Sequence, residues 1–157
     1  MASPLHPDVQ PLSFLLGVWR GEGKGAYPTI EPFRFGEEIR FDHVGEPYLV
    51  YEQSSWLLED GDPLHLERGF LRLRGDRVEI ALAHPLGLAE ISEGLLEGTT
   101  FAVETGAVAR TATGSPVTGV RRRYRVEGDR LTYELDMELT AVPMTRHLEA
   151  ELRLDRS

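Results

Sequence analysis

Apolar and polar residues alternate along most of the chain. A period of two is typical of β-strands that have one buried and one exposed face. Residues that favour turns, such as Gly75-Asp76 and Glu127-Gly128-Asp129, interrupt this alternation at short intervals. The pattern predicts about ten strands, over Val18–Tyr27, Glu37–Val44, Tyr48–Leu58, His65–Arg74, Arg77–His84, Gly87–Gly98, Thr99–Thr111, Val120–Val126, Arg130–Thr140 and His147–Leu154.

The order of these elements favours an all-β fold, a single antiparallel up-and-down β-barrel like that of lipocalins and fatty-acid-binding proteins. Consecutive strands without crossover helices form antiparallel sheets, and closing the sheet removes its exposed edges. A barrel of this size can enclose a small-molecule cavity. A two-sheet sandwich would fit the same pattern. The only helix predicted is a short turn over Pro11–Gly17, where Leu12, Leu15 and Leu16 share a face.

Composition narrows the functional classes. The 157 residues, of which 41% are apolar, suit one domain over residues 1–157, with residues 1–10 as an N-terminal arm. A formal net charge of −9 argues against nucleic acid or an anionic membrane as partner. The chain has no cysteine, no apolar run of membrane-spanning length and no basic region typical of a signal peptide. We therefore expect a cytoplasmic protein.

The segment Gly17–Ile30, GVWRGEGKGAYPTI, is unusually rich in glycine for a strand. Glycines at positions 17, 21, 23 and 25 predict strong coiling of the strand or a close approach of backbone or ligand. Alternatively, they only bend the first strand so that the barrel can close. The segment is not a dinucleotide-binding fingerprint, because no βαβ unit follows it. We expect Trp19 and Tyr27 to anchor the barrel floor or its cavity.

Three histidines, His65, His84 and His147, lie in predicted strands or at their ends. Histidines in such places are more often structural than ligands, and no pair has the i, i+4 or H-x-H spacing typical of zinc sites. No G-x-S-x-G motif indicates Ser/His/Asp catalysis. The acidic residues are scattered and are interpreted as solvated surface. Alternation nevertheless lets His84 and Met137 face a barrel interior.

Four segments carry a resemblance to a known family. They are HPDVQPLSFLLGVWRGEGKGAYPTIEPFRFGEEIRFDHVGEP, PLHLERGFLRL, GLAEISEG and PMTRHLEAEL, and they follow one another over essentially the whole chain. In these segments the chain resembles the nitrobindins, small haem-binding β-barrels.

This resemblance implies one haem b per chain in a cleft at one end of the barrel, with His147 as the proximal ligand of iron and the catalytic group. It also implies that Thr29 contacts the haem and that His65 lies on the other side of the pocket. His84 and Met137, if they face inward, are further candidates for cofactor contacts from the distal side, and the alternative for His84 is a strand-end histidine bonded to a turn. Nitrobindins bind nitric oxide and isomerise peroxynitrite to nitrate, and they often form homodimers. Two alternatives are a lipocalin-like carrier of a fatty acid or another hydrophobic ligand without iron, and a scaffold barrel without a cofactor.

The strand pattern around His147 sets a condition on this role. Strict alternation places Leu148, Ala150 and Leu152 on one face and His147 on the other. If the leucines fill the core, His147 can reach a haem only by preceding the regular strand or by lying at a bulge near the barrel mouth. Pro143, which cannot donate a ladder hydrogen bond, makes such an irregularity plausible.

Overall fold

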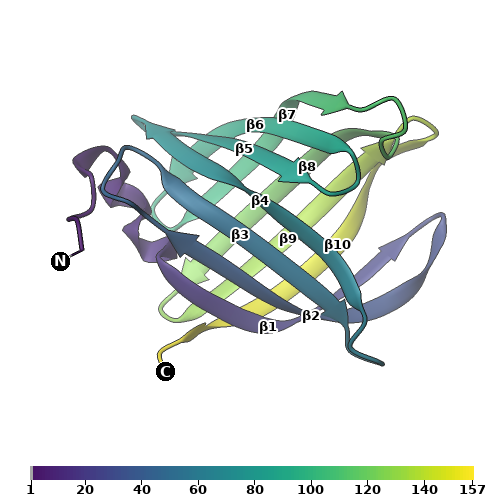
Figure 1. Ribbon diagram of the computed structural model, residues 1–157, viewed down its shortest axis with the longest axis horizontal. Coiled ribbons are helices and arrows are strands. Elements are labelled where there is room, and N and C mark those ends of the chain that lie inside the picture. Colours follow the sequence, from purple (N-terminus) through teal and green to yellow (C-terminus); the bar gives the residue numbers. More distant parts are fainter. Residues whose placement is uncertain (1) are drawn as a thin grey trace.

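The computed structural model describes residues 2–157 and forms a closed antiparallel barrel (Figure 1). Each strand pairs with its neighbours in sequence, and β1 closes the barrel against β10. The predicted up-and-down barrel is therefore confirmed, and the sandwich is excluded. The ten strands are β1 (Gly17–Tyr27), β2 (Ile30–Asp42), β3 (Leu49–Leu57), β4 (Pro63–Arg74), β5 (Arg77–His84), β6 (Leu88–Glu97), β7 (Thr100–Arg110), β8 (Val117–Glu127), β9 (Arg130–Leu139) and β10 (Val142–Asp155).

Two strands, β2 and β10, begin much earlier than the sequence pattern predicted. β2 begins at Ile30 rather than Glu37, because a turn of only two residues separates it from β1. β10 begins at Val142 rather than His147. Both extensions contain an exposed proline, Pro32 or Pro143, at a position where the missing N–H is tolerated. The additional residues lengthen the barrel wall at the end where Figure 1 shows the β1–β2 hairpin projecting.

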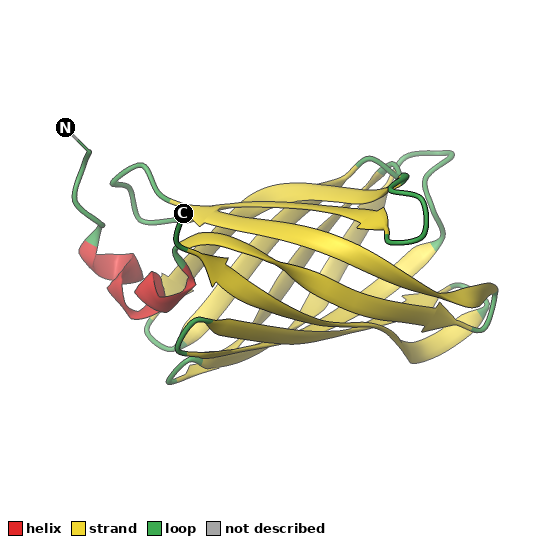
Figure 2. Ribbon diagram, turned by 90° about the horizontal axis from the view of Figure 1, so that it is seen from below, coloured by secondary structure: helices red, strands yellow, loops and turns green. Residues whose placement is uncertain are grey.

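A 3-10 helix, η1 (Pro7–Leu15), covers the opposite end of the barrel (Figure 2). It begins earlier than the predicted Pro11, so part of the expected N-terminal arm is helical. The indole Nε1 of Trp19 donates a hydrogen bond to the carbonyl oxygen of Leu15 at 2.8 Å. Trp19 thus lies at the end closed by η1. The helix side chains buried in the same core are Val9, Leu12 and Leu15. Among residues 2–157, no helix is long and apolar enough to cross a membrane.

Close packing against neighbouring strands explains why two positions of β1, Gly21 and Gly25, are glycine. A Cβ at Gly21 would lie 2.1 Å from the carbonyl oxygen of Glu151 on β10. A Cβ at Gly25 would lie 2.2 Å from the ring of Phe33 on β2. The close approach predicted for this segment is present at both positions, and Gly25 lets the ring of Phe33 pack directly against the backbone of β1.

Candidate functional site

A cavity of about 440 Å³ lies in the half of the barrel away from η1. Strands β2 to β6 and β8 to β10 contribute to its wall. The side chains near its mouth are mostly apolar, and charged and hydroxyl groups lie further in. The apolar side chains at the mouth include Ile30, Phe33, Leu57, Leu64, Leu86 and Val117, and the inner polar ones include Tyr51, Glu67, Glu90, Arg122 and Tyr124.

His147 reaches this cavity because β10 contains a β-bulge. Arg146 pairs with Asp136 and Leu148 pairs with Leu135, so His147 is an additional residue without a partner on β9. As a result, His147 and Leu148 both line the cavity, although consecutive residues of a regular strand face opposite sides. This bulge is the irregularity that His147 needs in order to face the cavity together with Leu148.

The surroundings of His147 determine which of its nitrogens is free. Its Nδ1 lies 3.0 Å from the carbonyl oxygen of Ala26, which can only accept a hydrogen bond. Nδ1 therefore carries the proton, and Nε2 keeps an unprotonated lone pair. Burial lowers the pKa of His147, against the opposing effect of the bond to Ala26, so the imidazole stays neutral. The rings of Tyr27 and Phe33 pack edge-on against it, with centroids 5.3 and 6.3 Å away.

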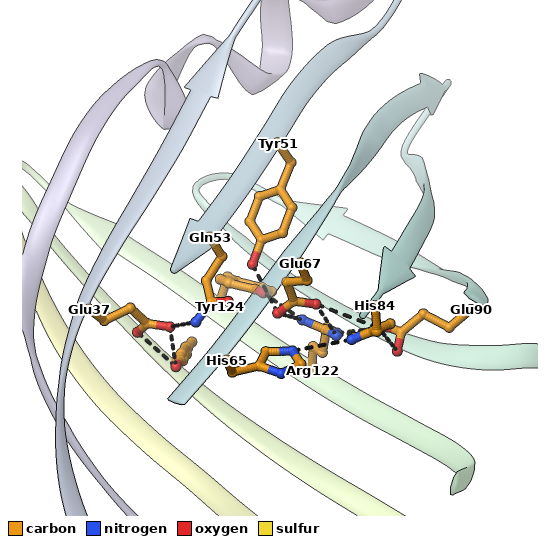
Figure 3. A network of polar contacts seen from close by, with 10 residues as sticks. Glu37, Tyr51, Gln53, His65, Glu67, His84, Glu90, Arg122 and Tyr124 are labelled. Carbon is orange, nitrogen blue, oxygen red and sulfur yellow. Dashed lines mark hydrogen bonds and ion pairs between the residues drawn. The ribbon is translucent and has the colours of Figure 1, made fainter. Parts of the chain in front are cut away.

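Arg122 forms the centre of a buried polar network on the cavity wall (Figure 3). Its Nη2 donates to Oε2 of Glu67 at 2.8 Å, and its Nε donates to Oε1 of Glu90 at 3.0 Å. Burial alone would raise the pKa of Glu67, but the charge and hydrogen bonds of Arg122 lower that pKa to about 2. Glu67 is therefore ionised at neutral pH.

His84 connects this network to His65. Nε2 of His84 lies 3.0 Å from Oε2 of Glu90, and Nδ1 of His84 lies 3.2 Å from Nε2 of His65 (Figure 3). Burial lowers the pKa of His65, so its neutral form is favoured. The two histidines come from neighbouring strands, β4 and β5, and both line the cavity.

A second polar group surrounds Glu37. The carboxylate accepts hydrogen bonds from the hydroxyl of Tyr133 at 2.8 Å and from Nε2 of Gln53 at 2.7 Å. Burial raises the pKa of Glu37 to about 7, because these donors only partly replace water. Within residues 2–157, Oε1 of Gln53 has no hydrogen-bond partner. Glu37 and Gln53 both line the cavity and are candidates for polar contacts with a ligand.

The structure brings most of the predicted site residues to one cavity. His65, His84, Met137 and His147 all line it. Thr29 does not, because it lies exposed in the turn between β1 and β2, next to the lining residue Ile30. The hydroxyl of Tyr27 donates to the carbonyl oxygen of Met137 at 2.9 Å, which ties β1 to β9 beside His147.

The interpretation of the acidic residues as solvated surface is wrong for Glu37, Glu67 and Glu90. All three are buried and face the barrel interior, where hydroxyl, amide and guanidinium groups satisfy them. The candidate site residues predicted from the sequence also did not include Arg122. Alternation contained the signal, since Arg122 shares a strand face with Val120 and so points inward.

Comparison with known proteins identifies the family. The family model described as the THAP4-like, heme-binding beta-barrel domain matches residues 8–153. The chain belongs to this family. The resemblance to nitrobindins that the sequence motifs indicated is thereby confirmed.

Its relatives match over nearly the whole chain. Peroxynitrite isomerase 2 of Mycobacterium ulcerans is 45% identical over 98% of each chain, and peroxynitrite isomerase of Nocardia farcinica is 45% identical over 96% of this chain and 93% of that one. The crystal structure of Rv2717c from M. tuberculosis superimposes with a TM-score of 0.91 at 42% identity, covering 98% of this chain and 100% of that one. An S-type phycobiliprotein lyase from Guillardia theta, at a TM-score of 0.64 and 12% identity, shares the fold alone.

Proposed function

We propose that the protein binds one haem b at the mouth of its cavity through Nε2 of His147, binds nitric oxide and isomerises peroxynitrite to nitrate. The observation that carries this proposal is the β10 bulge, which turns a neutral imidazole toward the cavity. Its Nδ1–H donates to the carbonyl of Ala26, and its other nitrogen is left as a donor atom. Metal-bound histidines typically donate their second N–H to such an acceptor.

The residues around His147 fit a haem. Phe33 and Tyr27 hold the imidazole edge-on, so its orientation is fixed before a ligand arrives. The apolar side chains at the mouth, among them Leu57, Leu64 and Val117, suit a flat apolar macrocycle, and a shell of this kind limits the access of water to the metal. The heme-binding description of the family and the names of the curated relatives support the same cofactor and substrate.

When bound, the haem would supply an iron with one coordination position open to nitric oxide or peroxynitrite. The chain's residues would hold and orient the reactants. We assign the proximal position to His147, contacts near the macrocycle to Thr29 and Met137, and contacts with a small ligand to His65 and His84. The proton of His147 stays on Nδ1, which donates it in a hydrogen bond to the Ala26 carbonyl oxygen, and this keeps Nε2 available.

Titration of the haem-free protein with hemin tests the proposal. We expect one hemin per chain with a Soret band, and loss of that band in a folded His147→Ala variant. His43→Ala, which changes a half-buried histidine outside the cavity, is the matched control and should keep the band. A Soret band unchanged by His147→Ala would overturn His147 as ligand. Failure of the wild type to bind hemin would instead favour the carrier without iron. Nitrate yield from peroxynitrite then tests the catalytic part with the hemin-loaded protein.

A further inference from the structure

We propose that His65, His84 and Glu67 form a second metal site, which binds one divalent transition-metal ion apart from the haem assigned to His147. One ligand atom from each of these residues lies within 4.8 Å of the others. All three side chains line the cavity, so an ion held there would be open to a small ligand on one side. This inference goes beyond the proposed function and does not depend on it.

The separation of the two imidazoles matches that of neighbouring metal ligands. Nδ1 of His84 and Nε2 of His65 are 3.2 Å apart. Two nitrogens bound at about 2.1 Å to the same tetrahedral or octahedral ion lie about 3.0–3.4 Å apart. An ion could therefore be held between the rings with only small movements of the side chains.

The hydrogen bonds of His84 leave the required nitrogen free. Glu90 accepts a hydrogen bond from Nε2 of His84 at 3.0 Å, so the proton of the neutral ring is on Nε2 and the lone pair is on Nδ1. A carboxylate bonded to the remote nitrogen is a common support for a metal-binding histidine. Arg122 holds that carboxylate in place through its bond to Oε1 of Glu90.

Glu67 offers the third ligand. Its Oε1 accepts hydrogen bonds from Arg122 and Tyr51, whereas Oε2 accepts from Arg122 alone. A carboxylate oxygen has two lone pairs, so Oε2 keeps one for a metal. Two carboxylates, Glu67 and Glu90, share the single guanidinium of Arg122, and the charge that remains favours a cation.

The donor set selects the class of ion. Two imidazole nitrogens and one carboxylate oxygen suit Zn²⁺, Co²⁺, Ni²⁺ or Fe²⁺, whereas Mg²⁺ and Ca²⁺ prefer oxygen ligands. The alternative is a direct hydrogen bond between His65 and His84 that binds no ion. The spacing of histidines in the sequence gave no sign of this site, because its ligands come together through the pairing of β4 with β5.

The test is a calorimetric and absorption titration of the full-length, untagged, chelator-treated protein with Co²⁺. We expect one Co²⁺ per chain with visible d–d bands, displaced by Zn²⁺, both without and with bound hemin. His65→Ala and His84→Ala should each weaken binding at least about 10-fold, and Glu90→Gln about 10–100-fold. The matched controls, His43→Ala and His147→Ala, should bind Co²⁺ like the wild type.

Any of three results would overturn the site: no stoichiometric Co²⁺ binding, binding that persists in folded His65→Ala and His84→Ala, or binding lost in His147→Ala. A measurement on the wild type covers the case in which a variant does not fold. Zn²⁺ should shift the side-chain nitrogen NMR signals of His65 and His84 and leave those of His147 unchanged, and the reverse pattern would refute the assignment. The Soret band measures hemin binding by His147 and does not depend on the second metal site. Failure of the haem proposal can therefore be distinguished from failure of the metal-site proposal.

Discussion

The two ends of the barrel use the same alternation of inward and outward residues for different purposes. Near η1 the inward residues are apolar and tightly packed, as around Trp19 and Leu131, which have no exposed surface. Away from η1 the inward residues include Glu37, Glu67 and Arg122, which are buried with hydrogen-bonding partners around a cavity. One half of the interior supplies hydrophobic stability, and the other half holds polar groups whose burial is costly.

A single strand can serve both halves. The inward residues of β4 run from His65 and Glu67 in the cavity to Leu71 and Leu73 in the packed core. The change occurs at Gly69, where a Cβ would lie 1.9 Å from the carbonyl oxygen of Ala81 on β5. The difference between the two ends therefore comes from which residues occupy the inward positions, not from a change of architecture.

Removal of Trp19 tests the packed end most severely. Trp19→Ala should lower the free energy of unfolding by about 4–5 kcal/mol, because it leaves a cavity and removes the hydrogen bond to Leu15. Urea unfolding followed by circular dichroism measures this loss. Trp56→Ala, at a half-buried position on β3, is the control and should cost less. The folded fraction of Trp19→Ala should still bind hemin; loss of hemin binding there would show that the two ends are coupled.

Removal of Arg122 tests the polar end. Arg122→Met leaves Glu67 and Glu90 buried without their cation, so the free energy of unfolding at pH 7 should fall by about 3–5 kcal/mol. Urea unfolding is again the measurement. Arg123→Met, which changes the exposed neighbouring arginine, should change stability by less than about 0.5 kcal/mol. Equal losses in the two variants would show that the network does not stabilise this end.

Glu37 gives the polar end a pH dependence. Burial raises the pKa of Glu37 from its ordinary value of 4.5 to about 7, so the folded protein binds the proton more tightly than the unfolded chain does. Stability therefore falls as pH rises from about 4.5 to beyond 7. Glu37→Gln removes this loss, and its stability relative to wild type should increase by up to about 3 kcal/mol between pH 5 and pH 8.

Urea unfolding at both pH values measures this difference for Glu37→Gln. Glu97→Gln, at an exposed carboxylate, serves as control and should show no such change. A difference between Glu37→Gln and wild type that is the same at pH 5 and pH 8 would contradict the raised pKa.

The smallest expected effect lies at the edge between β1 and the cavity mouth. Gly25→Ala places a Cβ against the ring of Phe33, which must then move from its place beside His147. We expect a loss of about 1–3 kcal/mol in the free energy of unfolding and weaker hemin binding. Gly106→Ala, a strand position where an added Cβ meets nothing within 4 Å, is the matched control. Unchanged hemin affinity in Gly25→Ala would show that the position of Phe33 does not affect hemin binding.

The sequence predicted the barrel well because alternation and turn residues are local signals. Its errors at the starts of β2 and β10 lie in segments that contain Pro32 and Pro143, and the structure places both prolines at exposed positions within strands. The short helix was found, but its start at Pro7 was missed because a 3-10 helix lacks the apolar repeat of an α-helix.

The candidate site was predictable only in part. The resemblance to nitrobindins singled out His65 and His147, and alternation turned His84 and Met137 inward. The contact between His65 and His84 depends on the register of β4 against β5, which no local pattern encodes. Arg122 is different, because the alternation of β8 places it on the same face as Val120 and Tyr124, and this local pattern alone indicates a buried charge.

Because His147 lies at a bulge, the proposed ligand can change independently of the strand pairing that forms the barrel. Leu148 and Leu152 pair with Leu135 and Leu131 of β9, while His147 has no opposite residue there. The histidine is thus one extra residue between the paired positions Arg146 and Leu148. A barrel of this topology could gain or lose such a residue as a unit, by insertion or deletion of one codon, without changing which leucines face its core.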